Sequence, residues 1–392
     1  MGLFLRQLSV RHYRSVRAIT LPVERLSVFL GANGAGKTNL YRALELVQGA
    51  AAGTLAADLA AEGGLDSAFW AGTRKRSEEA RIALAVDLGE TPGDAPGRAA
   101  FGYAVEVGYP YPTAAAFAAE PQVKEETLLH RHGRRETKLL ERRGPSLVAR
   151  DEDGARAEFD ADLMASETAL SRLEDPSRFP DLQTVKSALL DWRFYHDLRT
   201  DAGSPLRRPC PAVASPTLAS DGANLAAVFA TLAHIRQDTV ALDQTVADAF
   251  PGARLDIPPP GRTASFGLAM PDYPQRVFEA HELSDGTLRF LGLAGALLAY
   301  RLPGFIALNE PESSLHPDML EPLGRLIARA AERTQVWVVT HSERLAAAIA
   351  EHGAVTPRTV IKAEGATTVR GLKAWGAFDD DDADGEDDAV GE

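Results

Sequence analysis

The chain has 392 residues, of which 45% are hydrophobic and 25% are charged, and its formal net charge is −13. This composition is typical of a globular protein and argues against a wholly disordered or fibrous chain. The sequence has no run of about 18 uninterrupted apolar residues and holds one cysteine, Cys210. We therefore expect no membrane span, no disulfide framework and no cysteine-ligated metal site. The amino-terminal segment lacks the pattern of a secretory signal, so we expect a cytoplasmic protein.

The negative charge is concentrated at the carboxyl end. Residues 379–392 contain nine acidic side chains and no basic one, so residues 1–378 carry a net charge of only −4. Such a run repels itself and predicts a disordered acidic tail over 376–392. We favour a solvated tail, and the alternative is a tail that competes with nucleic acid for basic groups.

The amino-terminal region predicts two strands and a helix. Alternating runs at 3–10 and 25–31 predict strands on either side of a turn-like segment at 14–23. A glycine-rich turn at 31–36 comes next, and the apolar spacing over 38–47 predicts the helix that follows it.

The middle of the chain is less regular. Short strand-like runs between 81 and 160, broken by Gly and Pro, predict an antiparallel β-lobe. A mostly helical insertion is expected over 161–280. Its longest predicted helix, 224–249, carries an apolar stripe that we assign to core packing in preference to a short coiled-coil seam. The other elements expected here are helices at 163–173 and 181–191, a strand at 192–198 and a proline-rich connector at 203–217.

Residues 281–375 alternate between helical and strand-like patterns. Such alternation predicts a parallel sheet with helices on its faces. The sequence therefore predicts an α/β fold with a mainly parallel sheet flanked by helices, plus the antiparallel β-lobe and the helical insertion. The elements expected in this region are helices at 286–301, 318–332 and 343–350 and strands at 304–308 and 335–340.

The strongest motif is Gly31-Ala-Asn-Gly-Ala-Gly36-Lys37-Thr38, between a predicted strand and a predicted helix. This is the P-loop pattern, in which glycines let backbone N–H groups and a helix N-terminus surround phosphate oxygens. Lys37 is expected on the β- and γ-phosphates and Thr38 on Mg²⁺. The candidate ATP-binding residues are Gly31, Asn33, Gly34, Ala35, Gly36, Lys37, Thr38 and Asn39.

A P-loop requires an acidic partner, usually at the end of a neighbouring apolar strand. The run FIALNE at 305–310 supplies one, and we predict Glu310 as the catalytic base that orients or deprotonates the attacking water. The alternative is that Glu310 serves only the metal shell. Asn309 stands where a magnesium-binding aspartate is usual, and its neutral amide predicts a weaker metal contact.

Two further elements are significant together with the P-loop. Ser284, Asp285 and Gly286 open a predicted helix and form a second candidate anion site. His341 follows an apolar strand, where it is placed to sense the γ-phosphate.

These motifs resemble those of the ATP-binding-cassette type of ATPase. GANGAGKT, LSDGT, IALNEPESSLHP and VVTHS are similar to those of its soluble branch, which contains RecF, the SMC-like repair ATPases and a group of RecF-like predicted ATPases. HYRSVRAI, WRFYHDLRTD and DGANLA are also similar to segments of that branch. On this resemblance the ATPase core comprises residues 1–80 and 281–375, with the β-lobe and the insertion between its two parts.

The resemblance implies an ATPase that forms a homodimer around ATP and Mg²⁺. Each P-loop would face the partner's signature residues Ser284, Asp285 and Gly286. Glu310 would be the base, His341 the switch histidine, and residues 313–316 the loop that crosses the dimer interface. Gln122 is a candidate for the glutamine loop of this family.

The sequence departs from the family pattern in three ways. Asp285 replaces a common glycine, and Asn309 replaces the usual acid. The longest predicted helix would span only about 40 Å, which is too short for an SMC-type arm.

Three functions are compatible with these motifs. We favour an ATP-driven dimer that acts on DNA in repair or genome maintenance, mainly because the resemblance implies it. Basic residues in the β-lobe and before it could contact a DNA backbone, and the equal alternative is an ordinary solvated strand pair. The alternative is a nucleotide-switched regulator of a protein partner, as in phage defence, without DNA contact, while a small-molecule phosphotransferase is disfavoured. The basic residues are Arg131, Arg134, Arg135, Lys138, Arg142 and Arg143, with Arg74, Lys75 and Arg76 before them.

Overall fold

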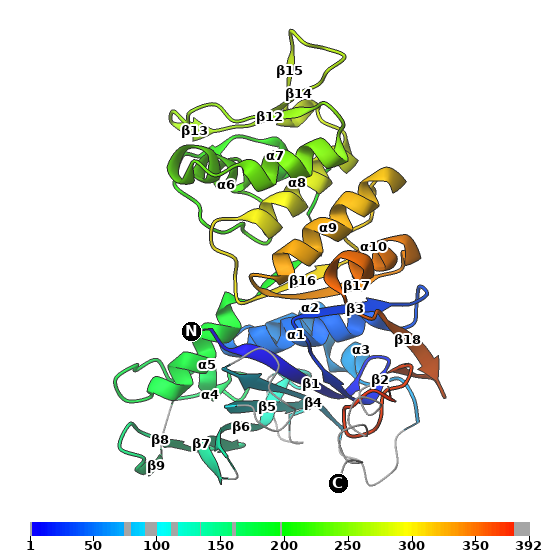
Figure 1. Cartoon of the computed structure of the whole chain (residues 1–392). Coiled ribbons are helices and arrows are strands. Elements are labelled where there is room, and N and C mark those ends of the chain that lie inside the picture. Colours follow the sequence, from blue (N-terminus) through cyan, green and yellow to red (C-terminus); the bar gives the residue numbers. More distant parts are fainter. Residues whose placement is uncertain are drawn as a thin grey trace, which may run out of the picture. The chain divides into compact units, whose positions relative to one another are not determined.

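The structure is a computed structural model that describes residues 2–73, 80–90, 100–110, 117–133, 135–158, 162–196 and 198–379 (Figure 1). The chain divides into two compact units. The first comprises residues 1–24, 31–192 and 358–392, and the second comprises residues 25–30 and 193–357. None of the helices in the described residues is long and apolar enough to cross a membrane.

The first unit is built on an eight-stranded antiparallel sheet with the strand order β2-β1-β4-β5-β6-β7-β8-β9. The strands of the predicted β-lobe thus share a sheet with the two amino-terminal strands. Every second residue of β4 is buried, as expected for a strand with one face on a core. The strands are β1 (Phe4–Tyr13), β2 (Val16–Pro22), β4 (Arg81–Gly89), β5 (Phe101–Gly108), β6 (Gln122–His132), β7 (Arg135–Arg143), β8 (Ser146–Arg150) and β9 (Arg156–Glu158).

Helix α1 (Lys37–Ala52) packs against β1 and β4 of this sheet and buries Leu40, Leu44 and Val47. This burial confirms the predicted helical spacing. The remaining elements of the unit are α2 (Leu55–Ala61), α3 (Gly64–Ala68), α4 (Ala169–Arg172), α5 (Pro180–Asp191) and the hairpin of β18 (Arg358–Ala363) and β19 (Ala366–Val369).

The second unit contains the parallel sheet, with neighbouring strands in the order β10-β16-β17-β3. β16 and β17 are buried along nearly their whole length, as expected for strands covered on both faces. Helices α9 and α10 pack on β17, and α8 packs on α9 (Figure 1). These elements are β3 (Leu26–Leu30), β10 (Arg193–Tyr195), β16 (Phe305–Asn309), β17 (Gln335–Thr340), α8 (Asp285–Leu298), α9 (Leu320–Ala331) and α10 (Glu343–Gly353).

The predicted insertion supplies the rest of the second unit, a layer of short helices and strands whose apolar side chains join the core of α8 and α9. Its elements are η1 (Pro205–Arg207), β11 (Cys210–Pro211), α6 (Leu225–Ala230), η2 (Thr231–Arg236), α7 (Val240–Ala249), β12 (Arg254–Asp256), β13 (Thr263–Ala264), β14 (Gly267–Ala269), β15 (Val277–Glu279) and η3 (Ala280–Glu282). A further 3-10 turn, η4 (Pro317–Met319), precedes α9.

Three predicted elements are wrong. The helix expected at 163–173 is reduced to the single turn α4 (Ala169–Arg172). The turn-like segment at 14–23 contains strand β2, because the reversal is confined to Arg14 and Ser15 and the following residues pair with β1. The single helix at 224–249 is interrupted: it widens into a π-helix over Thr231–Arg236 and ends at Gln237, whose φ is +52°. The acidic run from 380 onward lies outside the described residues.

Candidate active site

The P-loop has the backbone conformation that its sequence predicts. Gly34 and Gly36 have φ values of +78° and +98°, in the left-handed region that glycine adopts without a Cβ clash. The buried Lys37 donates from Nζ to the carbonyl oxygens of Gly31, at 2.5 Å, and Ala32, at 3.0 Å. Its amine is therefore held against the loop, whereas Asn33, Gly34 and Thr38 are exposed.

A set of hydroxyl groups behind the loop was not identified from the sequence. Thr367, on β19, donates to the carbonyl of Ala35 at 2.9 Å and lies 2.6 Å from the Ser15 hydroxyl. A Cβ on Gly36 would lie 1.9 Å from the Thr367 hydroxyl, so only glycine fits here. Asn39, predicted to contact the nucleotide, donates its side-chain amide to Ser15 at 2.6 Å. No sequence pattern links residues 15 and 367, which are brought together by the fold.

Glu310 and His341 follow adjacent parallel strands, β16 and β17. The Glu310 carboxylate lies 3.7 Å from Nδ1 of His341, and both side chains are partly exposed. Glu310 has a φ of +47°, an uncommon conformation for a residue with a Cβ and one that concentrates at functional sites. Hydrogen bonds from its N–H to Val339 and from Arg289 to its carbonyl hold the turn.

Glu312 is a buried carboxylate that the sequence did not mark as functional. One of its oxygens accepts hydrogen bonds from the Thr340 hydroxyl at 2.5 Å and from the backbone N–H groups of His341 and Ser342 at 3.0 and 3.3 Å. The same oxygen lies 3.2 Å from Nδ1 of His341. Glu312 therefore fixes the backbone on which His341 is carried.

The predicted signature residues begin helix α8. The Ser284 hydroxyl caps this helix by accepting from the Thr287 N–H at 3.2 Å. Asp285 pairs at 2.7 Å with Arg207, whose guanidinium also donates to the carbonyl oxygens of His281 and Leu283. The aspartate that departs from the family pattern thus has an arginine partner within the same chain.

Gly286 lies against the loop at 313–316. A Cβ at this position would lie 2.7 Å from the Ser314 carbonyl oxygen, so the glycine permits a close approach of the two segments. Ser314 itself has a φ of +66°. The second unit thus brings together the signature and the loop that the resemblance assigns to the dimer interface.

Gln122, the candidate for the glutamine loop, is the first residue of β6. Its side-chain oxygen accepts a hydrogen bond from Lys124 at 3.3 Å. This contact within the sheet does not distinguish a nucleotide role from a structural one.

The donor types at Thr38 and Asn309 fit Mg²⁺, which prefers hard oxygen ligands. Oδ1 of Asn309 is buried and accepts no hydrogen bond from the described part of the chain, so this oxygen retains coordinating capacity. The described residues contain no group of three or more His, Cys, Asp or Glu side chains that could hold a metal ion by themselves. Mg²⁺ would therefore need ligands from phosphate oxygens and water as well, as is usual for this ion.

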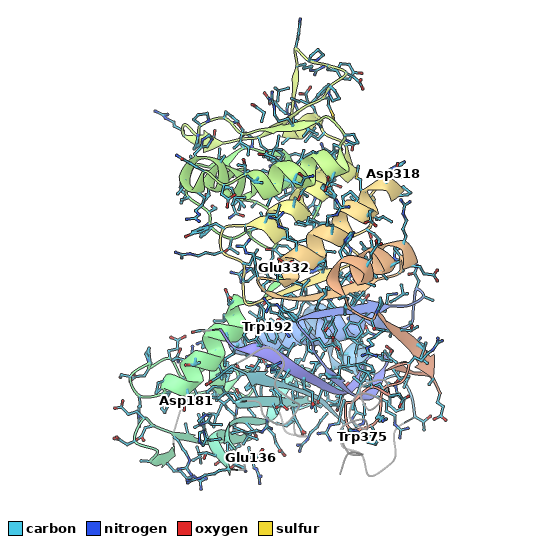
Figure 2. The ribbon with its side chains drawn as sticks, in the orientation of Figure 1. Glu136, Asp181, Trp192, Asp318, Glu332 and Trp375 are labelled. Atoms are coloured by element: carbon cyan, nitrogen blue, oxygen red, sulfur yellow. The ribbon has the colours of Figure 1, made fainter. Side chains whose placement is uncertain are left out.

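Most of the described basic residues of the β-lobe are already paired within the fold. Arg131 donates to Asp87 at 2.5 Å and to Glu136, labelled in Figure 2, at 2.8 Å. Arg142 is buried and donates to backbone carbonyls. Lys138 and Arg143 both contact Glu141, at 2.8 and 3.2 Å. Arg134 and the run Arg74, Lys75 and Arg76 lie outside the described residues.

Among the solved structures to which this chain is similar are SMC head domains. One is the Smc head domain with an extended coiled coil, bound to the C-terminal domain of ScpA, derived from Pyrococcus furiosus. It matches with a TM-score of 0.50 and 13% sequence identity, over 94% of this chain and 96% of that chain. The SMC head domain from Thermotoga maritima matches with a TM-score of 0.43 and 14% identity, over 95% of this chain and all of that one.

The Pyrococcus furiosus match confirms the predicted P-loop ATPase fold of the ATP-binding-cassette head type. No curated protein matches the chain. The family described as "AAA domain, putative AbiEii toxin, Type IV TA system" matches residues 26–347, which is most of the sequence. The chain therefore belongs to this AAA domain family, and its fold is like that of an SMC head domain.

Proposed function

We propose that the protein hydrolyses ATP to ADP and phosphate, and that two copies enclose the nucleotide. The observation that supports this most strongly is the Glu310–His341 pair at the ends of β16 and β17, in a chain that also carries a complete P-loop. A carboxylate beside an imidazole is suited to orienting water and to responding to a phosphate.

In this proposal each residue has one role. Lys37 and the backbone N–H groups of residues 33–38 bind the phosphates, and Glu310 accepts a proton from the attacking water. His341 contacts the γ-phosphate, and Glu312 holds the His341 backbone in place. Thr38 and Asn309 would hold Mg²⁺, which neutralises phosphate charge when bound.

The signature residues act in the partner subunit. Ser284 and Gly286 at the start of α8 offer N–H groups and a hydroxyl to the γ-phosphate held by the other chain. Binding of ATP would then close the dimer, and hydrolysis with release of phosphate would open it.

The catalytic proposal is tested by measuring phosphate release from ATP and Mg²⁺. We expect Lys37→Ala to lose nucleotide binding, and Glu310→Gln to bind ATP while hydrolysing it at least about 100-fold more slowly. Equal rates for wild type and Glu310→Gln would contradict the assignment of the base.

DNA is the target implied by the resemblance, and we propose it as the first candidate. A gel shift with and without ATP, at low and high salt, tests it. We expect a shift at low salt that weakens steeply as salt increases, because the contacts would be with phosphates. The absence of a shift at low salt would contradict a DNA target.

The second candidate is a nucleotide-switched regulator of a protein partner. It is supported by the ion pairing of Arg131, Lys138 and Arg143, which leaves the β-lobe with less free positive charge. It also agrees with a family description that names a toxin system. Capture of one partner protein by ATP-bound Glu310→Gln but not by Lys37→Ala, together with no DNA shift, would favour it.

A further inference from the structure

A cavity in the second unit is lined by none of the residues assigned above to ATP. It has a volume of about 230 Å³ and lies between η2, the start of α7, and the C-terminal ends of α8 and α9. Glu332, labelled in Figure 2, marks the end of α9 beside it.

The charged groups that line the cavity are mainly arginines. Three arginines and one aspartate line it, which gives the lining a net charge of +2: Arg236, Arg329, Arg333 and Asp238. Such an excess favours an anion, and guanidinium groups bind phosphate and carboxylate oxygens in bidentate fashion.

Two of the arginines are held in place before any ligand binds. The Arg236 guanidinium lies 4.4 Å from the centre of the Tyr300 ring. Arg333 donates from one terminal nitrogen to the carbonyl oxygens of Ala299 and Tyr300. Its guanidinium has further N–H groups that can donate to a ligand. Fixed donors bind an anion with less loss of side-chain entropy than mobile ones.

The rest of the lining is apolar. Leu232, Leu242, Leu297 and Leu298 are each less than 10% exposed and form part of the wall. The first residues of α7 also line the cavity, and the N–H groups of a first helical turn have no partner within the helix. The cavity therefore combines donors for an anion with a surface for a hydrocarbon group.

The backbone here is irregular. η2 is a π-helix, and it ends at Gln237 in the left-handed conformation. π-helical turns are rare and occur frequently at functional sites. Leu232 and Arg236, both on η2, line the cavity.

We propose that this cavity binds a small organic dianion that carries a compact apolar group, such as the phosphate monoester of an aromatic or aliphatic alcohol. A volume below the range of roughly 300–1,000 Å³ typical of drug-sized ligand sites is too small to enclose a whole nucleoside triphosphate. The site therefore differs from the proposed ATP site in residues and in ligand, and it does not depend on ATP hydrolysis.

Phenyl phosphate is the probe, with inorganic phosphate and phenol as its two halves. Binding is measured by saturation-transfer NMR titration in the Lys37→Ala background, so that the P-loop contributes little. We expect phenyl phosphate to bind with a Kd of about 1 mM, and each half to bind about tenfold more weakly.

The test variant is Arg329→Met and the matched control is Arg325→Met. Both arginines are exposed on α9, but Arg325 pairs with Asp248 and does not line the cavity. We expect Arg329→Met to weaken binding of phenyl phosphate about tenfold, as for the loss of one charge-assisted hydrogen bond, and Arg325→Met to change it less than about twofold. Arg236→Met serves as a second test variant with the same expected loss.

Three results would overturn the proposal. The first is no saturable binding of phenyl phosphate at concentrations up to about 10 mM. The second is equal affinity in the Arg329→Met and Arg325→Met proteins. The third is inorganic phosphate binding as tightly as phenyl phosphate, which would remove the role of the apolar wall.

Discussion

Glu312 does not touch ATP in the proposed mechanism, but we expect its replacement to lower both the free energy of unfolding and the rate of ATP hydrolysis. Replacement by alanine leaves the Thr340 hydroxyl and the His341 N–H group without this acceptor, while the Ser342 N–H group keeps its hydrogen bond to the Thr340 hydroxyl at 3.0 Å. We expect Glu312→Ala to lower the free energy of unfolding by about 2–4 kcal/mol, because buried donors would be left unpaired.

The Glu312→Ala substitution also distinguishes a role in positioning His341 from a role in binding ATP. Because Glu312 acts through His341, we expect kcat for ATP hydrolysis to fall at least about tenfold while the Kd for ATP changes little. Glu312→Gln keeps one carbonyl oxygen and should recover part of the loss. A Glu312→Ala protein with an unchanged kcat would contradict the positioning role.

Gly36 and Gly34 form a matched pair at the P-loop. Both have positive φ, but a Cβ on Gly34 meets no atom within 4 Å, whereas one on Gly36 meets the hydroxyls of Thr367 and Ser15. We expect Gly34→Ala to show only the backbone penalty of about 1–2 kcal/mol. Gly36→Ala should show this penalty and also weaken ATP binding at least about tenfold, because the loop must shift.

Thermal unfolding and nucleotide titration of the two variants check this difference. Removing Thr367 and Ser15 together by alanine substitution in the Gly36→Ala chain should restore part of the ATP affinity. Equal effects at both glycines would show that the hydroxyls behind the loop do not constrain it.

Helix α4 is anchored to the eight-stranded sheet by Glu126 of β6. This fully buried carboxylate accepts from the N–H groups of Ala169 and Leu170 at 2.6 and 2.9 Å and from the Tyr103 hydroxyl at 3.0 Å. Burial raises the pKa of Glu126 above its ordinary 4.5, although the hydrogen bonds oppose this rise.

A carboxyl group with a raised pKa makes the folded chain less stable as pH increases. In the interval from the ordinary pKa up to the raised one, the folded chain binds more protons than the unfolded chain, so the free energy of unfolding decreases as pH increases. Glu126→Gln cannot titrate. We expect it to be less stable by about 1–3 kcal/mol near pH 4.5, because its amide donors face backbone donors.

This deficit should shrink as pH rises toward 7, because only the wild-type chain loses the contribution of Glu126 to stability there. Chemical unfolding of both proteins at several pH values measures the difference. A difference that stays constant from pH 4.5 to 7 would show that Glu126 does not titrate above its ordinary range.

The elements that the sequence predicted well are those with a strong pattern. The strand at 335–340 and the helices at 286–301 and 343–350 lie within a few residues of β17, α8 and α10, because a buried parallel sheet leaves continuous apolar runs between helical patterns. The prediction of one helix over 224–249 was wrong because an apolar stripe at steps of three and four residues does not reveal a π-helical turn.

For the candidate site, local motifs predicted single residues but not their supports. Glu310 and His341 could be paired in advance because each follows an apolar strand, and parallel strands end at one edge of a sheet. The contact of Thr367 with the P-loop and that of Arg207 with Asp285 could not be predicted, because each joins segments far apart in sequence. The sequence showed Glu312 only as part of a motif. Its role was recognised from its burial in the structure.

At the scale of the whole molecule, the chain carries two complementary sets of residues. The first unit holds the P-loop, and the second holds the signature, Glu310 and His341. The resemblance to ABC-type ATPases assigns the P-loop of one chain to the signature of another. ATP-dependent dimerisation is therefore the central claim of the proposed function.

Sedimentation of Glu310→Gln with and without ATP and Mg²⁺ tests this claim most directly. Slow hydrolysis should trap the ATP-bound state, so we predict a particle of twice the monomer mass with ATP and a monomer without it. The double variant Glu310→Gln with Lys37→Ala should stay monomeric under both conditions. A Glu310→Gln protein that binds ATP and remains a monomer would contradict the account.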